Sequence, residues 1–174
     1  MSAITERARQ FLKGKTFAIA GVSQRRDDAA NYNYRTLKKK GYRVLAVNPK
    51  YDQFDGDPCY PSLKALPEKP DGLIIVTSPA ITLDLVREAV EVGIPAIWMH
   101  RATGTTNAFK SSESPMQSSV SEEAVRLAEE NGIQVIPGSC PMQFAGDVGH
   151  RCMGWIFRMT GGMKEPVSVH PEKA

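Results

Sequence analysis

Five short apolar segments alternate with amphipathic segments along this chain, and this alternation constrains the fold more than any other feature of the sequence. The apolar segments cover residues 17–23, 42–47, 72–77, 94–99 and 133–136. Continuous apolar runs of this length are typical of strands buried on both faces of a parallel sheet. Strands that alternate with helices form βαβ units with right-handed crossovers. The sequence therefore predicts an α/β fold, a single Rossmann-like domain with a doubly wound, five-stranded parallel sheet and flanking helices.

Four parts of the chain follow from this pattern. They are an N-terminal helix that packs on the domain (1–16), the Rossmann-like domain itself (17–141), a C-terminal helix (142–162) and a flexible tail (163–174). Either Ser2 or Thr5 is suited to cap the first helix. Within the domain, residues 103–119 are rich in serine and poor in apolar residues, which predicts a loop that acts as a lid.

One face of the C-terminal helix is apolar. Val148, Cys152, Trp155, Ile156 and Met159 fall at helical spacing. We expect this face to pack in the core or to form a dimer contact, and not to hold a cofactor.

Charge and composition exclude several classes of partner. The chain has 22 basic and 19 acidic residues among 174, and a net charge of +3 is too small to predict binding to nucleic acid. No segment reaches the roughly 18 apolar residues that a membrane span requires. The N-terminus does not resemble a signal peptide, and three cysteines without metal-site or disulfide spacing indicate a reducing compartment. We expect a cytoplasmic protein without a metal, membrane or nucleic-acid partner.

The turn after the first strand is the first candidate binding element. Parallel α/β sheets bind ligands outside the carboxyl ends of their strands, where the strand order reverses. Gly21 permits close approach of a ligand to the backbone, and the amides that follow it attract an anion. Ser23 adds a hydroxyl group, and Arg25 or Arg26 adds positive charge. An anion site is therefore favoured over a plain strand-to-helix turn.

The end of the second strand indicates which nucleotide fits. A dinucleotide fingerprint has the pattern GxGxxG at the first turn and an acidic residue after the second strand, where it binds the ribose diol. This chain has a single glycine at the turn and Asn48-Pro49-Lys50 after the second strand. A lysine ammonium pairs with a phosphate group on the ribose. NAD is therefore disfavoured, and coenzyme A (CoA) or NADP is favoured.

Several ordered segments resemble a known family. They are IAGVS (19–23), Ala30-Asn31, GYRVLAVNPK (41–50), CYPSL (59–63), DGLIIVTSP (71–79), AVEVGI (89–94) and IWMH (97–100). In this order they are similar to the small stand-alone CoA-binding proteins, whose domain also forms the nucleotide part of the succinyl-CoA synthetase alpha subunit. The resemblance covers roughly residues 17–141.

The resemblance implies a set of CoA contacts. The set is Gly21, Val22, Ser23 and Gln24 after the first strand, Asn48, Pro49 and Lys50 after the second, and Thr77, Ser78 and Pro79 after the third. To these we add Arg25 for its charge and His100 for its position after the fourth strand, which place them at the same edge. The His100 position is often glutamine in the family, and the serine-rich loop is longer than usual; both bear on the pantetheine end of the site. The synthetase domain with the phosphorylated histidine has no counterpart in this sequence, so ligase activity is not implied.

We therefore expect a module that binds CoA or an acyl-CoA without catalysis, and we assign no catalytic residue. We expect the chain to assemble either as a homodimer or with a partner enzyme. Two alternatives remain open. One is an NADP-dependent reductase or a CoA-dependent transferase that uses His100 or Cys140, since a thiol beside an imidazole is a nucleophile with its base. The other is an interaction protein that has lost its ligand site.

Overall fold

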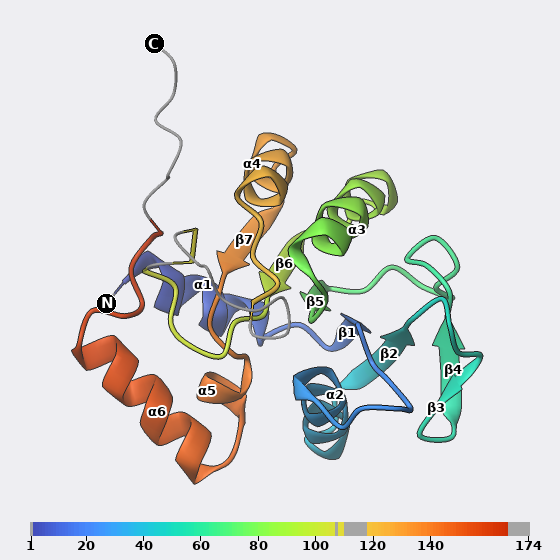
Figure 1. Ribbon diagram of the computed structural model, residues 1–174, viewed down its shortest axis with the longest axis horizontal. Coiled ribbons are helices and arrows are strands. Elements are labelled where there is room, and N and C mark those ends of the chain that lie inside the picture. Colours follow the sequence, from blue (N-terminus) through green and yellow to red (C-terminus); the bar gives the residue numbers. More distant parts are fainter. Residues whose placement is uncertain (1, 107, 110–117, 167–174) are drawn as a thin grey trace.

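In the computed structural model, which describes residues 2–106, 108–109 and 118–166, seven strands form one sheet in the order β3-β4-β2-β1-β5-β6-β7 (Figure 1). The strands are β1 (Thr16–Ala20), β2 (Arg43–Val47), β3 (Gln53–Phe54), β4 (Asp57–Tyr60), β5 (Gly72–Ile75), β6 (Ala96–Met99) and β7 (Gln134–Pro137). The five strands predicted from the apolar segments pair in parallel with their neighbours. The predicted α/β, Rossmann-like fold class is confirmed.

The predicted count of five strands is wrong, because a hairpin extends the sheet at one edge. β3 and β4 pair antiparallel, and β4 adds to β2 in parallel through the pair Ala46–Cys59. The hairpin turn contains Asp55 and Gly56, which both have positive φ, as a two-residue hairpin loop requires. β3 has only two residues and β4 contains Pro58, so neither shows the apolar run by which we identified the other strands.

Helices cover both faces of the sheet (Figure 1). They are α1 (Ala3–Phe11), α2 (Ala29–Lys39), α3 (Pro79–Val92), α4 (Glu122–Glu130), α5 (Met142–Ala145) and α6 (Val148–Met159). One core contains buried side chains of α1, α2 and α5, among them Phe11, Tyr34 and Met142. The other contains buried side chains of α3 and α4. Because successive residues of a strand point to opposite faces, Phe17 and Ala18 of β1 belong to different cores.

The C-terminal region departs from the predicted single helix over 142–162. The chain forms the short α5, turns at Gly146 and begins α6 after Asp147, whose side chain accepts a hydrogen bond from the His150 amide at 2.9 Å. A Cβ atom at Gly146 would lie 2.4 Å from the Met142 carbonyl oxygen, so this turn requires glycine. The expectation that the apolar face of the last helix packs in the core is also wrong, because Trp155 is 56% exposed.

Two predicted segments lie partly outside the described residues. In the serine-rich segment 103–119, residues 107 and 110–117 are not described, and in the predicted tail 163–174 residues 167–174 are not described. Among the helices of the described ranges, none is long and apolar enough to cross a bilayer.

Gly21 joins the first strand to both of its neighbours. Its amide donates to the Val47 carbonyl of β2 at 3.1 Å, and its φ is +109°. On the other side, a Cβ atom would lie only 2.1 Å from the Val76 carbonyl oxygen, directly after β5. The space beside this glycine is therefore filled by the protein's own backbone. A side chain at position 21 would therefore collide with the Val76 carbonyl before it could meet a ligand.

Substitution of Gly21 by alanine is predicted to destabilise the fold severely. The methyl group cannot fit against the Val76 carbonyl, and the left-handed backbone adds strain, so the loss exceeds about 3 kcal/mol. Gly41→Ala is the matched control, because Gly41 also has positive φ but nothing lies within 4 Å of its Cβ position; it should lose only about 1–2 kcal/mol. Urea unfolding followed by circular dichroism measures both, and equal losses would contradict this account.

Candidate functional site

The carboxyl ends of four neighbouring strands carry all the predicted site residues. Across the sheet, the ends of β2, β1, β5 and β6 lead into residues 48–50, 21–25, 77–79 and 100, respectively. The winding reverses between β1 and β5, because α2 and α3 pack on opposite faces (Figure 1). Such a reversal is where open α/β sheets bind ligands. The structure therefore brings the predicted residues to a single edge.

The loop after β1 is held in shape by two polar side chains. The Ser23 hydroxyl oxygen accepts hydrogen bonds from the amides of Arg25 and Arg26 at 3.1 and 3.2 Å. Asn31, which is 2% exposed in the first turn of α2, accepts from the Ser23 amide and donates to the carbonyls of Ser23 and Arg26. These contacts fix residues 23–26 before any ligand arrives. Asn31 was not among the predicted site residues, although it belongs to a matching segment.

The turn after β2 is tied to the turn after β1. Asn48 donates from Nδ2 to the Val22 carbonyl at 2.7 Å, and its Oδ1 accepts from the Lys50 amide at 2.9 Å. Pro49 and Lys50 are both exposed. In the part of the chain that the structure describes, no carboxylate pairs with the Lys50 ammonium group. Lys50 therefore places an unneutralised charge at this edge.

The segment after β5 contacts the serines at 118–119. The Thr77 amide donates to the Ser119 hydroxyl at 3.0 Å, and the Thr82 hydroxyl donates to the Ser119 carbonyl at 2.8 Å. Ser78 precedes α3 with Pro79 as the first helical residue, and the Ser78 side chain makes no capping hydrogen bond. The Ser78 hydroxyl is thus not used to cap the helix.

His100 and Cys140 are both buried, and burial shifts the pKa of each toward its neutral form. His100 is 5% exposed, and burial lowers the pKa of its imidazole to about 4, so the ring is neutral at pH 7. Burial raises the pKa of the Cys140 thiol to about 11, even though the amides of Met142 and Gln143 and the side chain of Asn33 contact its sulfur. Among the described residues, no hydrogen bond or charge interaction joins the two side chains. A neutral, buried thiol is a poor nucleophile.

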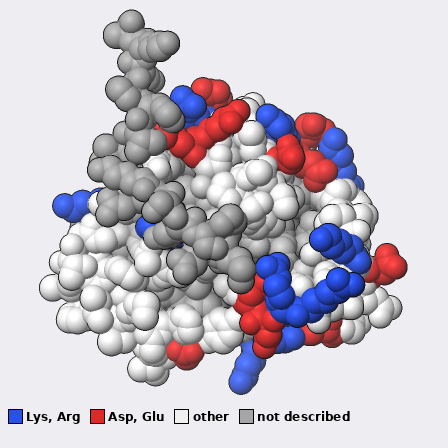
Figure 2. Space-filling view, in the orientation of Figure 1, with Lys and Arg blue, Asp and Glu red and all other residues white. Residues whose placement is uncertain are grey.

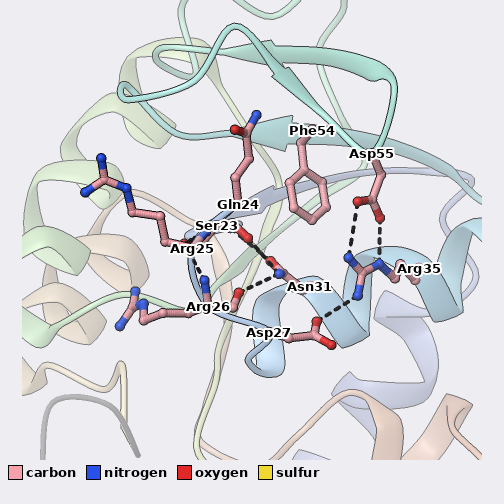
Figure 3. A pocket seen from close by; sticks show the side chains of 9 residues that line it. All are labelled: Ser23, Gln24, Arg25, Arg26, Asp27, Asn31, Arg35, Phe54 and Asp55. Carbon is pink, nitrogen blue, oxygen red and sulfur yellow. Dashed lines mark hydrogen bonds and ion pairs between the residues drawn. The ribbon is translucent and has the colours of Figure 1, made fainter.

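A hollow of about 440 Å³ lies beside the edge, between the loop after β1 and the β3–β4 hairpin (Figure 3). Its lining consists of Ser23, Gln24, Arg25, Arg26, Asp27, Asn31, Arg35, Phe54 and Asp55. Only the first three of these belong to the predicted site. Residues 77–79 and 100 do not line the hollow, so it lies beside the β1 loop and not beside those residues.

The cations around this hollow differ in their partners. Arg35 pairs with Asp55 at 2.6 Å and with Asp27 at 2.7 Å. The hydrogen bond from Arg35 lowers the pKa of the Asp55 carboxyl. Figure 3 shows Arg25 extending away from that group, and no carboxylate of the described residues pairs with it. Arg25 is thus the cation of this loop that is suited to an external anion. Across residues 2–106, 108–109 and 118–166, no cluster of three or more His, Cys, Asp or Glu residues is suited to a metal ion.

Most of this chain is similar to a known family of domains. Residues 15–144 match the family model described as CoA binding domain. The ADP-forming acetate–CoA ligase I of Archaeoglobus fulgidus is 30% identical over 127 residues, which are 72% of this chain but only 18% of the ligase. The uncharacterized protein YneT of Bacillus subtilis is 24% identical over 128 residues, 74% of this chain and 83% of that protein. The structure of a hypothetical protein from Pyrococcus horikoshii OT3 superposes with a TM-score of 0.68 at 24% identity, covering 87% of this chain and 92% of the other.

The buried imidazole predicts a pH dependence of stability. The pKa of His100 is about 4 in the folded chain and about 6.5 when unfolded, so between these values the unfolded chain binds the extra proton. Stability is then full above about pH 6.5 and falls by about 3 kcal/mol as the pH drops to 4. His100→Gln should lose this component, so that its unfolding free energy falls less over pH 6.5–4 than that of the wild type. If the unfolding free energies of the two proteins fall equally over this pH range, the imidazole is not buried as described.

Proposed function

The chain belongs to the CoA-binding domain family, and on this premise we propose that it binds coenzyme A or an acyl-CoA at the carboxyl ends of β2, β1, β5 and β6, as a module that does not itself catalyse a reaction. The observation that carries the proposal is the joined pair of turns after β1 and β2, with Lys50 unpaired beside them. A ligand that fits must offer phosphate groups to this end of the edge.

The residues present suit the phosphates of CoA. Lys50 is positioned to pair with the 3′-phosphate of the ribose, since it is exposed and starts from a turn that Asn48 and Pro49 hold. Arg25 and the loop that follows Gly21 are suited to the diphosphate. Both cations lack a carboxylate partner in the described ranges, so no internal ion pair has to break when the ligand binds.

The other end of the edge suits the less polar part of the ligand. Residues 77–79 and His100 would contact pantetheine, and the neutral imidazole of His100 adds no charge there. CoA supplies a thiol that carries acyl groups as thioesters. The chain's own residues are required only to bind and orient it.

NAD fits this edge less well. In the dinucleotide pattern a carboxylate after β2 binds the ribose diol, and residues 48–50 carry no carboxylate. NADP shares the ribose phosphate with CoA, but the loop after β1 has the single glycine Gly21 in place of the dinucleotide pattern. These two features favour CoA over both nicotinamide cofactors.

Neither rival function gains support from a specific observation. A transferase would need a reactive thiol or an effective base, and burial keeps the Cys140 thiol protonated and lowers the pKa of His100 to about 4, which makes its imidazole a weak base. A lost ligand site would not need loop contacts as complete as those of Asn31 and Asn48. The residues that match the ligase from Archaeoglobus fulgidus make up only 18% of that protein. We propose that this chain binds CoA and presents it to a partner enzyme.

The contribution of the ribose phosphate provides the main test. A charge-assisted contact at a partly exposed site is worth about 1.5–3 kcal/mol, which corresponds to roughly ten- to a hundred-fold in affinity. Wild-type protein should therefore bind CoA more tightly than dephospho-CoA by this factor in calorimetry, and NAD weakly or not at all. In Lys50→Ala the two CoA forms should bind almost equally, because the mutation and the missing phosphate remove the same interaction.

Lys39→Ala is the matched control, because Lys39 is an exposed lysine at the end of α2, away from the edge. It should retain the full preference for CoA. If Lys50→Ala also retains that preference, Lys50 does not contact the phosphate. If the wild type binds NAD tightly and CoA not at all, the proposed function is wrong.

The thiol of Cys140 should be dispensable. We expect Cys140→Ser to keep the affinity for CoA within about three-fold, because a neutral buried group adds no charge to the site. We also expect acetyl-CoA incubated with wild type or variant to hydrolyse at the same slow rate. Wild-type hydrolysis that disappears in Cys140→Ser would assign a catalytic role to this residue.

A further inference from the structure

Helix α6 presents an apolar face to solvent. This α6 face consists of Val148, Cys152, Trp155, Ile156 and Met159, and all five residues are exposed. The exposed fraction reaches 81% for Val148 and 69% for Met159. Figure 2 shows few charged side chains in the region of α5 and α6, at the lower left. Charged side chains gather on the right-hand side of the same view. Contiguous apolar surface of this kind marks an interaction site.

The helix is firmly attached, so the face is not an unpacked part of the core. Its inner side is Gly154, where a Cβ atom would lie 2.5 Å from the Gln143 carbonyl oxygen of α5. The Tyr32 hydroxyl on α2 donates to the Asp147 carboxylate at 2.6 Å, and the Arg158 guanidinium lies over the Phe144 ring at 5.3 Å. The α6 face therefore points outward because the inner contacts are made by other residues.

The face lies outside the part of the chain that the family shares. The family match ends at residue 144, and α6 begins at Val148. The proposed CoA contacts all precede residue 101. The α6 face thus belongs to neither the shared domain nor the proposed ligand site.

The spacing of the face matches a helix-pair seam. Val148, Cys152, Trp155 and Met159 follow one another at intervals of four, three and four residues. This is the a/d pattern by which two helices pack along their length. A second copy of the chain provides the same seam, and a two-fold axis pairs identical surfaces. The spacing therefore favours a second copy over an unrelated partner.

The area of the face fits the same occupant. With about 100 Å² exposed on each side chain, the face reaches roughly 500 Å², near the upper limit for an apolar patch on a monomer. Each partner of a standard protein interface contributes about 800 Å². The face alone thus amounts to more than half of the area that a standard interface buries on each partner.

The helix dipole selects the orientation of the two helices. The side chains of Asp147 and Arg158 take part in the inner contacts of α6, so they do not select it. An antiparallel pair places the amino end of each α6 beside the carboxyl end of the other, which aligns the two helix dipoles favourably. A parallel pair would place the two amino ends side by side. We propose that the chain forms a two-fold dimer in which the α6 faces of two copies pack antiparallel, Val148 against Met159 and Cys152 against Trp155.

Sedimentation of the full chain tests the dimer. Wild-type protein should sediment as a dimer at about 50 μM, and Trp155→Lys should sediment as a folded monomer, because Trp155 is exposed and supports no core contact. Ile81→Lys is the matched control, since Ile81 is also exposed, at 52%, but lies on α3; this variant should remain dimeric. A monomeric wild type would overturn the proposal and leave the face to another partner. A Trp155→Lys variant that remains dimeric would also overturn the proposal.

Disulfide formation tests the orientation. In a Cys152→Ser background, the double variant Val148→Cys, Met159→Cys should cross-link between copies on mild oxidation, because antiparallel packing brings these two positions together. Neither single variant should cross-link, because the thiol at position 148 faces Met159 of the second copy and the thiol at position 159 faces Val148. Cross-linking of the single variants, or none in the double variant, overturns the antiparallel pairing. Neither experiment requires CoA, so its result is independent of the proposed function.

Discussion

The chain reverses its direction of winding between β1 and β5, and at the end of β1 the Gly21 backbone fits tightly between the segments of the two neighbouring strands. Its amide pairs with the Val47 carbonyl of β2, and the Val76 carbonyl occupies the space that a side chain would need. Only glycine adopts the required φ in so little room. Because β2, β1, β5 and β6 pair in parallel, their carboxyl ends lie at one edge, and α2 and α3 pack on opposite faces of the sheet (Figure 1).

The amide side chains of Asn31 and Asn48 convert this edge into a shaped surface. Asn31 holds the loop after β1, and Asn48 joins that loop to the turn after β2. Loops that are ordered before binding spare the ligand the entropy of ordering them. Arg25 and Lys50 then extend from fixed backbone positions, while Arg35 is neutralised by Asp27 and Asp55. Arg25 and Lys50, which have no carboxylate partner among the described residues, are the cations that the proposed CoA site would use.

The sequence predicted the parts of this fold that local patterns encode. Continuous apolar runs identified the five parallel strands, and the family resemblance that those runs and turns carried is confirmed. β3 and β4 escaped notice because a two-residue strand and one with Pro58 have no recognisable period. The contact between Asn48 and Val22 spans 26 positions, so no local pattern shows it. The apolar stripe of α6 was visible, but only the packing of Gly154 on Gln143 shows that it faces outward.

An NMR titration of the isotope-labelled full chain with CoA tests the central claim most directly, because it reports every backbone amide separately. The account predicts that chemical shifts change at residues 21–26, 48–51 and 77–82 and at His100. It predicts unchanged shifts for α4 and for the amino ends of the strands, on the opposite edge of the sheet. Changes confined to other surfaces, or no changes at millimolar CoA, would contradict a CoA site at the carboxyl ends of these four strands.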